Sequence, residues 1–229
     1  MGDSFKTSTN SSSEWRQTCA RWLSIVLFAA GFYLSGNARE SVAANVPPPG
    51  VTEADAVLAG GCFWGVDAVF KHVKGVISVT SGYSGGSEKT AQYGMVSTGT
   101  TGHAESVKIV YDPSRITYQQ LLKVFFFVAH NPTELNRQGP DTGTQYRSII
   151  FYTDGEQKEI AESYIAKLDK GKAFPEPIVT EVVPLKQFYP AEDYHQNFLE
   201  QNPDNPYIVY NDLPKLKQLR EQFPSLYNP

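Results

Sequence analysis

The sequence predicts a single layered domain of the α/β or α+β class that begins near residue 55. Short apolar runs of strand length alternate with longer segments in which apolar residues recur at helical spacing. The segment 55–229 has the length of one ordinary domain and is long enough to bury one core. Two polar stretches, 81–102 and 131–146, predict long loops, which are usually functional or disordered in a compact domain.

The first half of the domain predicts three strands and two helices. The apolar run 56–59 predicts a strand that two glycines end, and apolar residues at helical spacing predict a helix from Phe63 to about residue 73. A strand is expected over 76–80. The alternating pattern of 106–111 predicts a half-buried strand. Thr117 is expected to cap a helix that ends near residue 130.

The second half continues the alternation. A strand over 147–152 precedes a helix over 156–170, which Asp154 should cap and Gly171 should end. A further strand is expected over 178–183. The tail from Ala191 predicts two short helices separated by residues 203–214.

The N-terminal segment 1–43 indicates targeting. Two arginines precede the apolar run 22–34, which is shorter than the roughly 18 to 20 apolar residues of a membrane span, and small residues at 41–43 suit a cleavage site. A cleaved secretory signal peptide is the favoured interpretation; an uncleaved membrane anchor through 22–34 and an organellar transit peptide are the alternatives. Residues 44–54 predict a proline-rich linker. The chain is therefore expected to be exported or membrane-anchored, in a periplasm or lumen.

Charge and cysteine content exclude several classes. The formal net charge is −4 and no basic patch is concentrated anywhere, which argues against nucleic acid as a partner. Cys19 and Cys62 lie in segments of opposite character, so a disulfide framework is not expected. If the leader is removed after Ala43, Cys62 is the single thiol of the mature chain. No obvious exposed apolar surface is indicated, so a monomer is expected.

Cys62 lies at the turn between the first strand and the first helix. At that place unpaired backbone N–H groups and the helix dipole favour thiolate over thiol. The glycines on either side would let another molecule approach the backbone, and Phe63 and Trp64 would form an apolar wall beside the sulfur. The alternative is that Cys62 is a small buried hydrophobic residue of the core.

Six motifs in order along the chain resemble the peptide methionine sulfoxide reductases of the A type, which reduce the S epimer of methionine sulfoxide. They are Gly-Cys-Phe-Trp-Gly at 61–65, Ser-Gly-Tyr-Ser-Gly-Gly at 81–86, Thr-Gly-His-Ala-Glu at 101–105, Val-Tyr-Asp-Pro at 110–113, Gly-Thr-Gln-Tyr-Arg-Ser at 143–148 and Asp-Tyr-His-Gln at 193–196. The resemblance covers about residues 55–200. It implies a two-layer α/β (α+β) sandwich with a mixed central sheet, flanking helices and long coil segments.

The resemblance assigns the reacting groups. Cys62 would attack the sulfoxide sulfur, and Glu105 would be a carboxyl kept protonated by desolvation that gives its proton to the sulfoxide oxygen. Tyr93 and Tyr146 would donate hydrogen bonds to that oxygen. The products would be methionine and a sulfenic acid on Cys62. Alternatively, the two tyrosines only attach their loops and Glu105 is a surface carboxylate.

The resemblance also assigns substrate contacts. Phe63 and Trp64 would hold the terminal methyl group of the substrate, and Asp141 would shape its loop and contact the substrate backbone. No bound cofactor or metal is implied. His103 and His195 are expected to be structural hydrogen-bonding residues, because this mechanism requires no imidazole.

The sequence departs from the family pattern in its tail. Many relatives attack the sulfenic acid with further cysteines near the C-terminus, but residues 205–229 hold none. Cys19 is poorly placed for that task. The chain therefore resembles a single-cysteine member whose sulfenic acid needs an external thiol such as thioredoxin, glutaredoxin or glutathione. Asn131 and Pro140 also differ from common family residues, so the second loop can differ in detail.

Other function classes fit less well. A cysteine protease would pair Cys62 with His103 or His130 and with Asn131, but no local signature supports it. A zinc deaminase would need paired cysteines that are absent, and the segment 85–90 lacks the glycine that precedes the lysine of a phosphate loop. The best non-enzyme alternative is a binding module in which Cys62 is consumed stoichiometrically by methionine sulfoxide.

Overall fold

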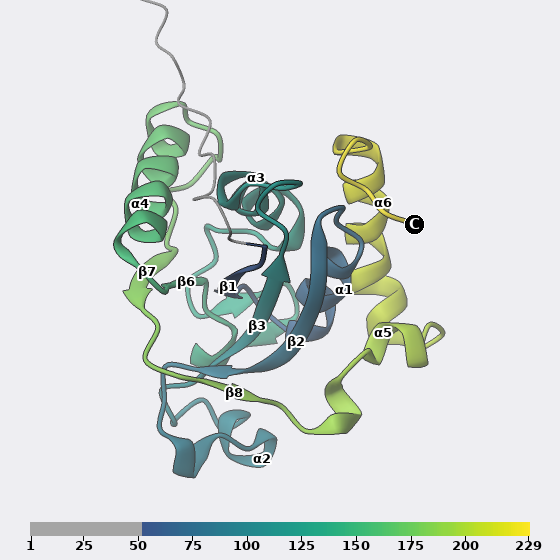
Figure 1. Cartoon of the computed structure of the whole chain (residues 1–229). Coiled ribbons are helices and arrows are strands. Elements are labelled where there is room, and N and C mark those ends of the chain that lie inside the picture. Colours follow the sequence, from purple (N-terminus) through teal and green to yellow (C-terminus); the bar gives the residue numbers. More distant parts are fainter. Residues whose placement is uncertain (1–51) are drawn as a thin grey trace, which may run out of the picture. The chain divides into compact units, whose positions relative to one another are not determined.

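A computed structural model describes residues 52–229, which form one α/β domain around a curved mixed sheet (Figure 1). The strand order is β7-β6-β1-β3-β2-β8, and only the β6–β7 pair is parallel. The strands are β1 (Ala54–Ala59), β2 (Val76–Ser84), β3 (Ala104–Tyr111), β6 (Ile149–Tyr152), β7 (Glu181–Pro184) and β8 (Phe188–Pro190). The predicted mixed sheet in a single domain is confirmed.

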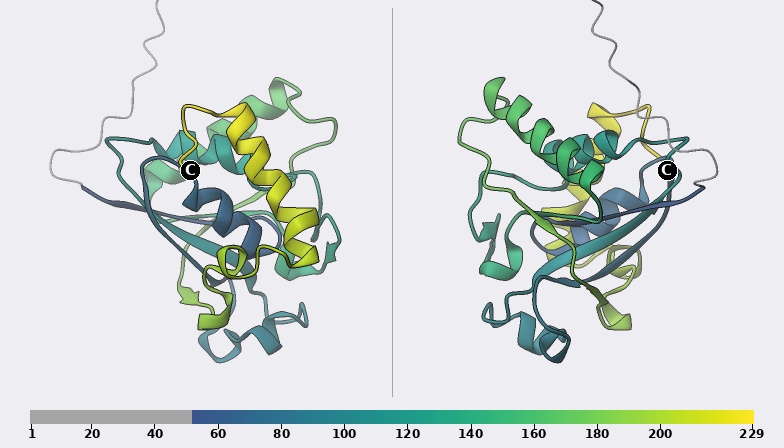
Figure 2. Two further views of the ribbon diagram at one scale, coloured as in Figure 1. Left: turned by 90° about the vertical axis from the view of Figure 1, so that its right-hand side faces the viewer. Right: turned by 60° about the vertical axis from the view of Figure 1, so that its left-hand side comes forward.

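Four helices cover one face of this sheet and share a single hydrophobic core with it (Figure 2). They are α1 (Phe63–Lys71), α3 (Tyr118–Val124), α4 (Gly155–Lys170) and α6 (Leu213–Gln222). Thr117 caps α3 with a complete capping box, and Asp154 caps α4, as predicted. A π-helical turn, Phe125–Ala129, extends α3.

Short elements lie around one end of the sheet. They are α2 (Tyr93–Val96), α5 (Phe198–Gln201), the two-stranded β4 (Arg137–Gln138) and β5 (Asp141–Thr142), the 3₁₀ turns Glu88–Thr90, Thr144–Tyr146 and Asp193–His195, and a second π-helical turn, Ile208–Asp212. The two predicted long loops are thus partly ordered as short helices and a hairpin.

The alternation of side chains along β3 decides which residues can take part in a site beneath the helices. Glu105, Val107 and Ile109 point to the helical face, where the latter two join the main core, and Ala104 joins a separate cluster on the other face. Glu105 lies opposite Tyr83 of β2 in the strand register. The sheet therefore presents the Glu105 carboxyl to the start of α1.

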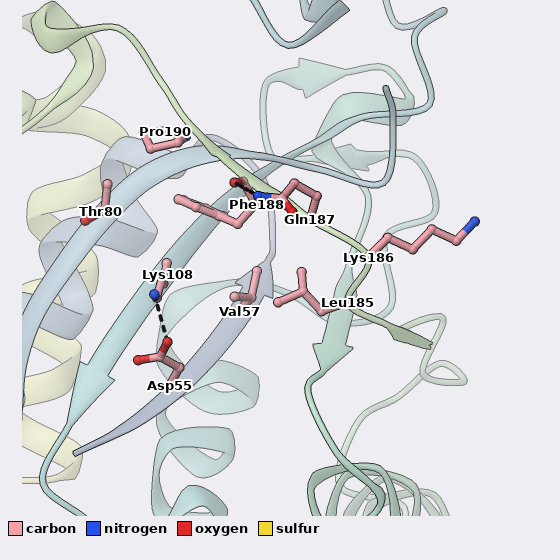
Figure 3. A pocket seen from close by; sticks show the side chains of 9 residues that line it. All are labelled: Asp55, Val57, Thr80, Lys108, Leu185, Lys186, Gln187, Phe188 and Pro190. Carbon is pink, nitrogen blue, oxygen red and sulfur yellow. Dashed lines mark hydrogen bonds and ion pairs between the residues drawn. The ribbon is translucent and has the colours of Figure 1, made fainter. Parts of the chain in front are cut away.

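The other face of the sheet holds a groove with a cavity volume of about 490 Å³ (Figure 3). Its lining consists of Asp55, Val57, Thr80, Lys108, Leu185, Lys186, Gln187, Phe188 and Pro190. Lys108 and Asp55 form an ion pair at 2.8 Å within it. Because these strand residues point away from the helices, the groove is separated by the sheet from Glu105.

Several predicted boundaries are wrong. Strand β2 continues to Ser84, past the predicted end at residue 80, because residues 81–84 pair with β3 despite their loop-like composition. Strand β7 begins at Glu181 and not at residue 178, and the three-residue edge strand β8 was not predicted. Pro214 does not separate two helices, since it occupies the first turn of α6, a position that proline tolerates.

The predicted leader 1–43, with Cys19, and most of the linker 44–54 lie outside the described residues. Within the part of the chain that the structure describes, no helix combines the length and the apolar character required to cross a bilayer.

Candidate active site

Cys62 is the residue that precedes α1, and only 8% of it is exposed. Burial raises the pKa of the thiol well above its ordinary value; the negative charges of Glu105 and Asp212 raise it further, and the Trp64 backbone N–H lowers it. The expectation that the helix start favours the thiolate is therefore wrong. Desolvation outweighs the helix terminus, so the resting sulfur is a thiol.

Glu105 extends from β3 to the first turn of α1. Its carboxyl is 2% exposed and accepts a hydrogen bond of 3.0 Å from the Phe63 backbone N–H. Burial raises the pKa of this carboxyl to about 8, although that N–H and the Cys62 thiol lower it. Glu105 is thus a protonated carboxyl at neutral pH beside the sulfur, and the alternative of a surface carboxylate is excluded.

Tyr93 and Tyr146 come from different segments and meet near these two groups. Tyr93 begins α2, and Tyr146 ends the 3₁₀ turn Thr144–Tyr146. Burial raises the pKa of both phenols, and the charges of Glu105 and Cys62 raise both further. Both hydroxyls therefore remain protonated donors at neutral pH and lie within electrostatic range of Cys62 and Glu105.

Trp64 and Phe63, which the sequence predicts as an aromatic wall, both lie next to the His195 ring. The Trp64 indole stacks on Phe198 with ring centroids 3.6 Å apart and meets the edge of Tyr207 at 5.9 Å. Its N–H donates to His195 Nδ1 at 3.2 Å, and the His195 ring lies 5.0 Å from that of Phe63. The wall is held by contacts on several sides.

Two further histidines, His103 and His130, serve the scaffold. His103 accepts a hydrogen bond from the Gly86 N–H, and the two ring nitrogens of His130 contact the Phe125 carbonyl and the Ser148 hydroxyl. Both rings use their polar atoms away from Cys62. The protease arrangement of Cys62 with either histidine is therefore absent from the described residues.

Asp141, in β5, accepts a hydrogen bond from the hydroxyl of Tyr207. Its negative charge raises the pKa values of Cys62 and Glu105, which places it in the same group of side chains. The structure therefore brings Asp141 to the site together with Tyr207, which the sequence did not single out. No sequence pattern marks Tyr207, because it lies 66 residues from Asp141 in a tail without clear periodicity.

Asp212 is a second buried carboxyl that the sequence did not reveal. It is 1% exposed, and Lys215 Nζ donates to its Oδ1 at 3.2 Å. A Cβ atom on Gly65 would lie 2.1 Å from that oxygen, and one on Gly61 would lie 2.5 Å from the Gln138 side chain. These two glycines thus make room for side chains of this chain, and the approach of another molecule to the backbone stays a prediction.

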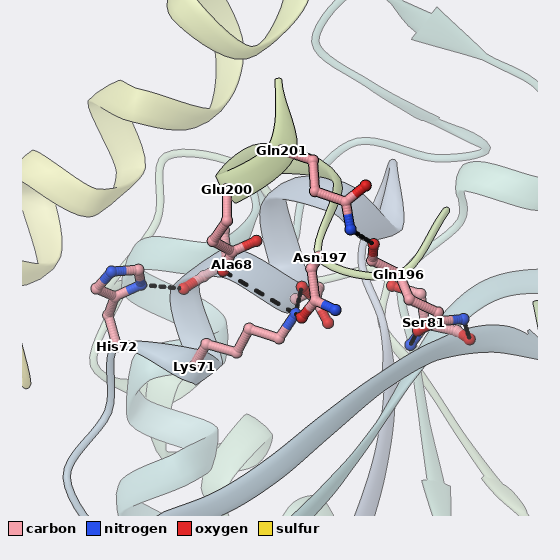
Figure 4. A network of polar contacts seen from close by, with 9 residues as sticks. Ala68, Lys71, His72, Ser81, Gln196, Asn197, Glu200 and Gln201 are labelled. Carbon is pink, nitrogen blue, oxygen red and sulfur yellow. Dashed lines mark hydrogen bonds and ion pairs between the residues drawn. The ribbon is translucent and has the colours of Figure 1, made fainter. Parts of the chain in front are cut away.

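The segment 191–196 and the residue after it connect β2 with α1 through side-chain hydrogen bonds (Figure 4). The Gln196 side chain accepts from the Ser81 N–H at 3.0 Å and donates to the Ser81 carbonyl at 2.9 Å, which joins the segment to β2. Beyond it, Lys71 of α1 donates to Asn197 at 2.6 Å. The sequence singled out this stretch as a motif, and the structure gives it a connecting role.

The fold and the site together define a class of protein: an α/β domain with a curved mixed sheet that brings a buried cysteine thiol and a buried, protonated carboxyl into one group of side chains. The profile of the family described as peptide methionine sulfoxide reductase matches residues 54–226. The chain belongs to that family, so it is an oxidoreductase that acts on methionine sulfoxide.

Individual relatives agree. Peptide methionine sulfoxide reductase MsrA 2 of Mesorhizobium japonicum is 63% identical over 173 residues, which cover 76% of this chain and 89% of that protein. The protein of the same name from Synechocystis sp. is 56% identical and covers 73% of this chain and 78% of its own length.

Solved structures match the fold. Reduced Mxr1 from Saccharomyces cerevisiae has a TM-score of 0.64 and 32% identity, covering 70% of this chain and 92% of that one. Methionine sulfoxide reductase A of Corynebacterium diphtheriae has a TM-score of 0.59 and 34% identity, covering 72% and 82%.

Proposed function

We propose that this protein reduces the S epimer of methionine sulfoxide, free or in proteins, with Cys62 as nucleophile and an external thiol as reductant. The observation that supports it most strongly is the Glu105 carboxyl. It is buried beside Cys62, accepts the Phe63 N–H and has a pKa of about 8, so it holds a proton at neutral pH.

In the first step the Cys62 sulfur attacks the sulfoxide sulfur while the Glu105 proton moves to the sulfoxide oxygen. The sulfur–oxygen bond of the substrate then breaks as the hydroxyl passes to the Cys62 sulfur. The sulfur–sulfur bond formed in the attack breaks with its electron pair on the methionine sulfur, which leaves Cys62 as a sulfenic acid. The Cys62 thiol proton restores Glu105. Methionine is released, and the two electrons have come from the cysteine sulfur.

Tyr93 and Tyr146 donate hydrogen bonds to the oxygen as negative charge develops on it. Phe63 and Trp64 receive the methyl group, and Asp141 contacts the substrate backbone. With methyl, oxygen and main chain held at three separate places, only one epimer presents its sulfur to Cys62. This three-point contact supports discrimination between the epimers, and the family resemblance is the basis on which we assign the S epimer.

The sulfenic acid is reduced from outside. One external thiol condenses with the sulfenic acid to a mixed disulfide and releases water, and a second thiol frees Cys62 as a thiol. Cys62 is the free cysteine among the described residues, and the tail that follows it contains no other. Thioredoxin, glutaredoxin and glutathione are the candidate reductants.

The test is turnover of the separate S and R epimers of a methionine sulfoxide peptide by the full chain with dithiothreitol. We expect turnover of the S epimer only, complete loss in Cys62→Ser and a strong loss in Glu105→Gln. Asp55→Asn, which removes a surface carboxyl on the other face of the sheet, is the matched control and should keep full activity. A single equivalent of product would favour the binding module, and activity in Cys62→Ser would exclude the mechanism.

We further propose that the chain works as a monomer exported or tethered by segment 1–43, since two arginines, an apolar run and small residues follow one another there. Fractionation of cells that express the full chain should place it outside the cytosol or on a membrane. Size-exclusion chromatography with light scattering should give the mass of one chain.

A further inference from the structure

Glu192 has no assigned role, yet its carboxylate joins two segments of the active site. One oxygen accepts a hydrogen bond from the Tyr83 hydroxyl at 2.8 Å, and the other accepts from the Tyr93 backbone N–H at 2.9 Å. Tyr83 belongs to the central sheet and Tyr93 begins α2. A single side chain therefore fixes the distance between the sheet and the helix that carries a proposed oxygen-binding tyrosine.

The sheet end of this connection is rigid. Tyr83 is fully buried, lies opposite Glu105 in the register of β2 and β3, and has its ring 5.9 Å from that of Phe63. The backbone next to Glu192 is held as well, because the Ala191 N–H donates to the Ser81 carbonyl at 2.9 Å. The Glu192 carboxylate is thus held in place by the strand pair β2–β3, which also positions the Glu105 carboxyl.

On the other side of the Glu192 connection, helix α2 is held by contacts with residues outside the helix. A helix of four residues is marginal by itself, and Gln92, the residue before it, makes no side-chain cap. The Tyr93 N–H has no intrahelical partner, and Glu192 accepts it with a charge-assisted bond. At the other end, Gln145 and Thr144 donate to carbonyls of residues 97 and 99, which ties α2 to the segment of Tyr146.

We infer that Glu192 is a positioning residue for Tyr93: by bonding the Tyr83 hydroxyl and the Tyr93 N–H at once, it holds the Tyr93 phenol beside Cys62 and Glu105. The inference rests on the proposed function, in which that phenol binds the sulfoxide oxygen. It assigns no contact between Glu192 and the substrate.

A carboxylate suits this task because both of its oxygens accept, so two donors are satisfied without competition. Partial burial raises the pKa of Glu192, but the bonds from Tyr93 and Tyr83 outweigh it and leave the pKa below the ordinary value. A glutamine keeps one acceptor for the Tyr93 N–H but turns an amide donor toward Tyr83. Glutamine should therefore preserve part of the effect and alanine none.

The test is a double-mutant cycle in the full chain with Glu192→Ala, Tyr93→Phe and both together. The rate of methionine formation is measured in a single turnover without reductant, along with kcat and KM. Glu192→Gln is the conservative variant. Glu200→Gln is the matched control, because Glu200 is an exposed acid eight residues away whose side chain forms an ion pair with Lys71 at 4.0 Å.

We expect Tyr93→Phe to slow the single turnover about 100-fold through loss of an oxygen-binding donor, and Glu192→Ala about tenfold through displacement of that donor. The double variant should be no slower than Tyr93→Phe alone, with KM nearly constant throughout. Glu192→Gln should fall between Glu192→Ala and wild type, and Glu200→Gln should equal wild type.

The inference would be overturned if Glu192→Ala lowered the single-turnover rate by the same factor with and without the Tyr93 hydroxyl. It would also be overturned if Glu192→Ala and Glu200→Gln lowered that rate equally. If Glu192→Ala does not fold, the cycle built with Glu192→Gln decides by the same rule. Full activity of Tyr93→Phe would refute the proposed role of Tyr93, and with it the inference. A slow Tyr93→Phe beside a fast Glu192→Ala would refute the inference alone.

Discussion

Two buried carboxyls lie beside Cys62, and their surroundings differ in one respect. Glu105 is 2% exposed and is bound by the Phe63 N–H, whereas Asp212 is 1% exposed and is bound by the ammonium group of Lys215. Burial raises the pKa of both groups, but Lys215 lowers that of Asp212 while no cation acts on Glu105.

Equal burial thus produces two kinds of carboxyl. Without a cation, Glu105 keeps its proton at neutral pH and can give it away. With a lysine, part of the effect of burial on Asp212 is offset, although its pKa stays above the ordinary value, and the carboxyl serves the packing of α6 against Gly65 of α1. The partner of a buried acid, more than its depth, decides whether it can be a catalytic acid.

The largest expected difference between the two is in activity. Glu105→Gln removes the proposed proton donor and should lower the single-turnover rate by about 10² to 10⁴. Asp212→Asn removes no donor and should lower it by about tenfold at most. The two rates are measured with the S epimer at saturating concentration. Equal losses would mean that Glu105 contributes only charge or packing.

The second difference is in the pH dependence of stability. The pKa of Glu105 is about 8 in the folded protein and near 4.5 when unfolded, so the unfolded chain releases this proton first as pH rises. The contribution of Glu105 is full below pH 4.5 and is lost between pH 4.5 and 8, an effect of about 3 to 5 kcal/mol.

Glutamine does not titrate, so the free energy of unfolding of Glu105→Gln should not contain this pH-dependent loss. Relative to the protein with Glu105, the variant should therefore become more stable by that amount between pH 5 and pH 8.5. Urea unfolding of both in a Cys62→Ser background, which removes the thiol titration, measures the gain. If the free energies of unfolding of the two proteins changed in parallel with pH, the Glu105 carboxyl would already be ionised in the folded protein.

Sequence patterns predicted the parts of the site that local structure creates. The apolar run, the glycines and the helical spacing around Cys62 placed this thiol at a helix start, and the family resemblance singled out Glu105, just before the predicted strand 106–111. The family resemblance supplied Tyr93, Tyr146 and Asp141, of which only Tyr146 lies within a quoted motif, and the fold brings them near Cys62 and Glu105.

The parts that were missed arise from tertiary packing. Tyr207, Asp212 and Glu192 lie in a tail without clear periodicity, and only the fold brings them to residues far away in the sequence. The length of β2 was underestimated because strand pairing stabilised glycine and serine in a strand. The ionisation state of Cys62 was wrong because the helix rule is local, while desolvation depends on everything packed around the sulfur.

The packing role of the Asp212–Lys215 pair predicts a smaller effect from Gly65. Gly65→Ala would drive a methyl group into the Asp212 carboxyl and Lys215, and it should cost about 2 to 3 kcal/mol in the free energy of unfolding. Gly155→Ala, at the open first turn of α4, is the control and should be neutral or slightly stabilising. Chemical denaturation gives both values. An unchanged stability of Gly65→Ala would show that α6 can move away from α1 at little cost.

The smallest effect should appear in the ionisation of Cys62, where both carboxyls act in the same direction. Burial accounts for most of the raised thiol pKa, and Glu105 adds more than Asp212 does. Alkylation by iodoacetamide follows the thiolate, so its rate against pH reports the thiol pKa. Removing a negative charge favours the thiolate, so both Glu105→Gln and Asp212→Asn should lower that pKa, the first by more. A larger decrease in the Cys62 pKa from Asp212→Asn than from Glu105→Gln would mean that Lys215 does not offset the charge of Asp212 at the sulfur. The difference between a carboxyl with a cationic partner and one without would then not extend to the ionisation of Cys62.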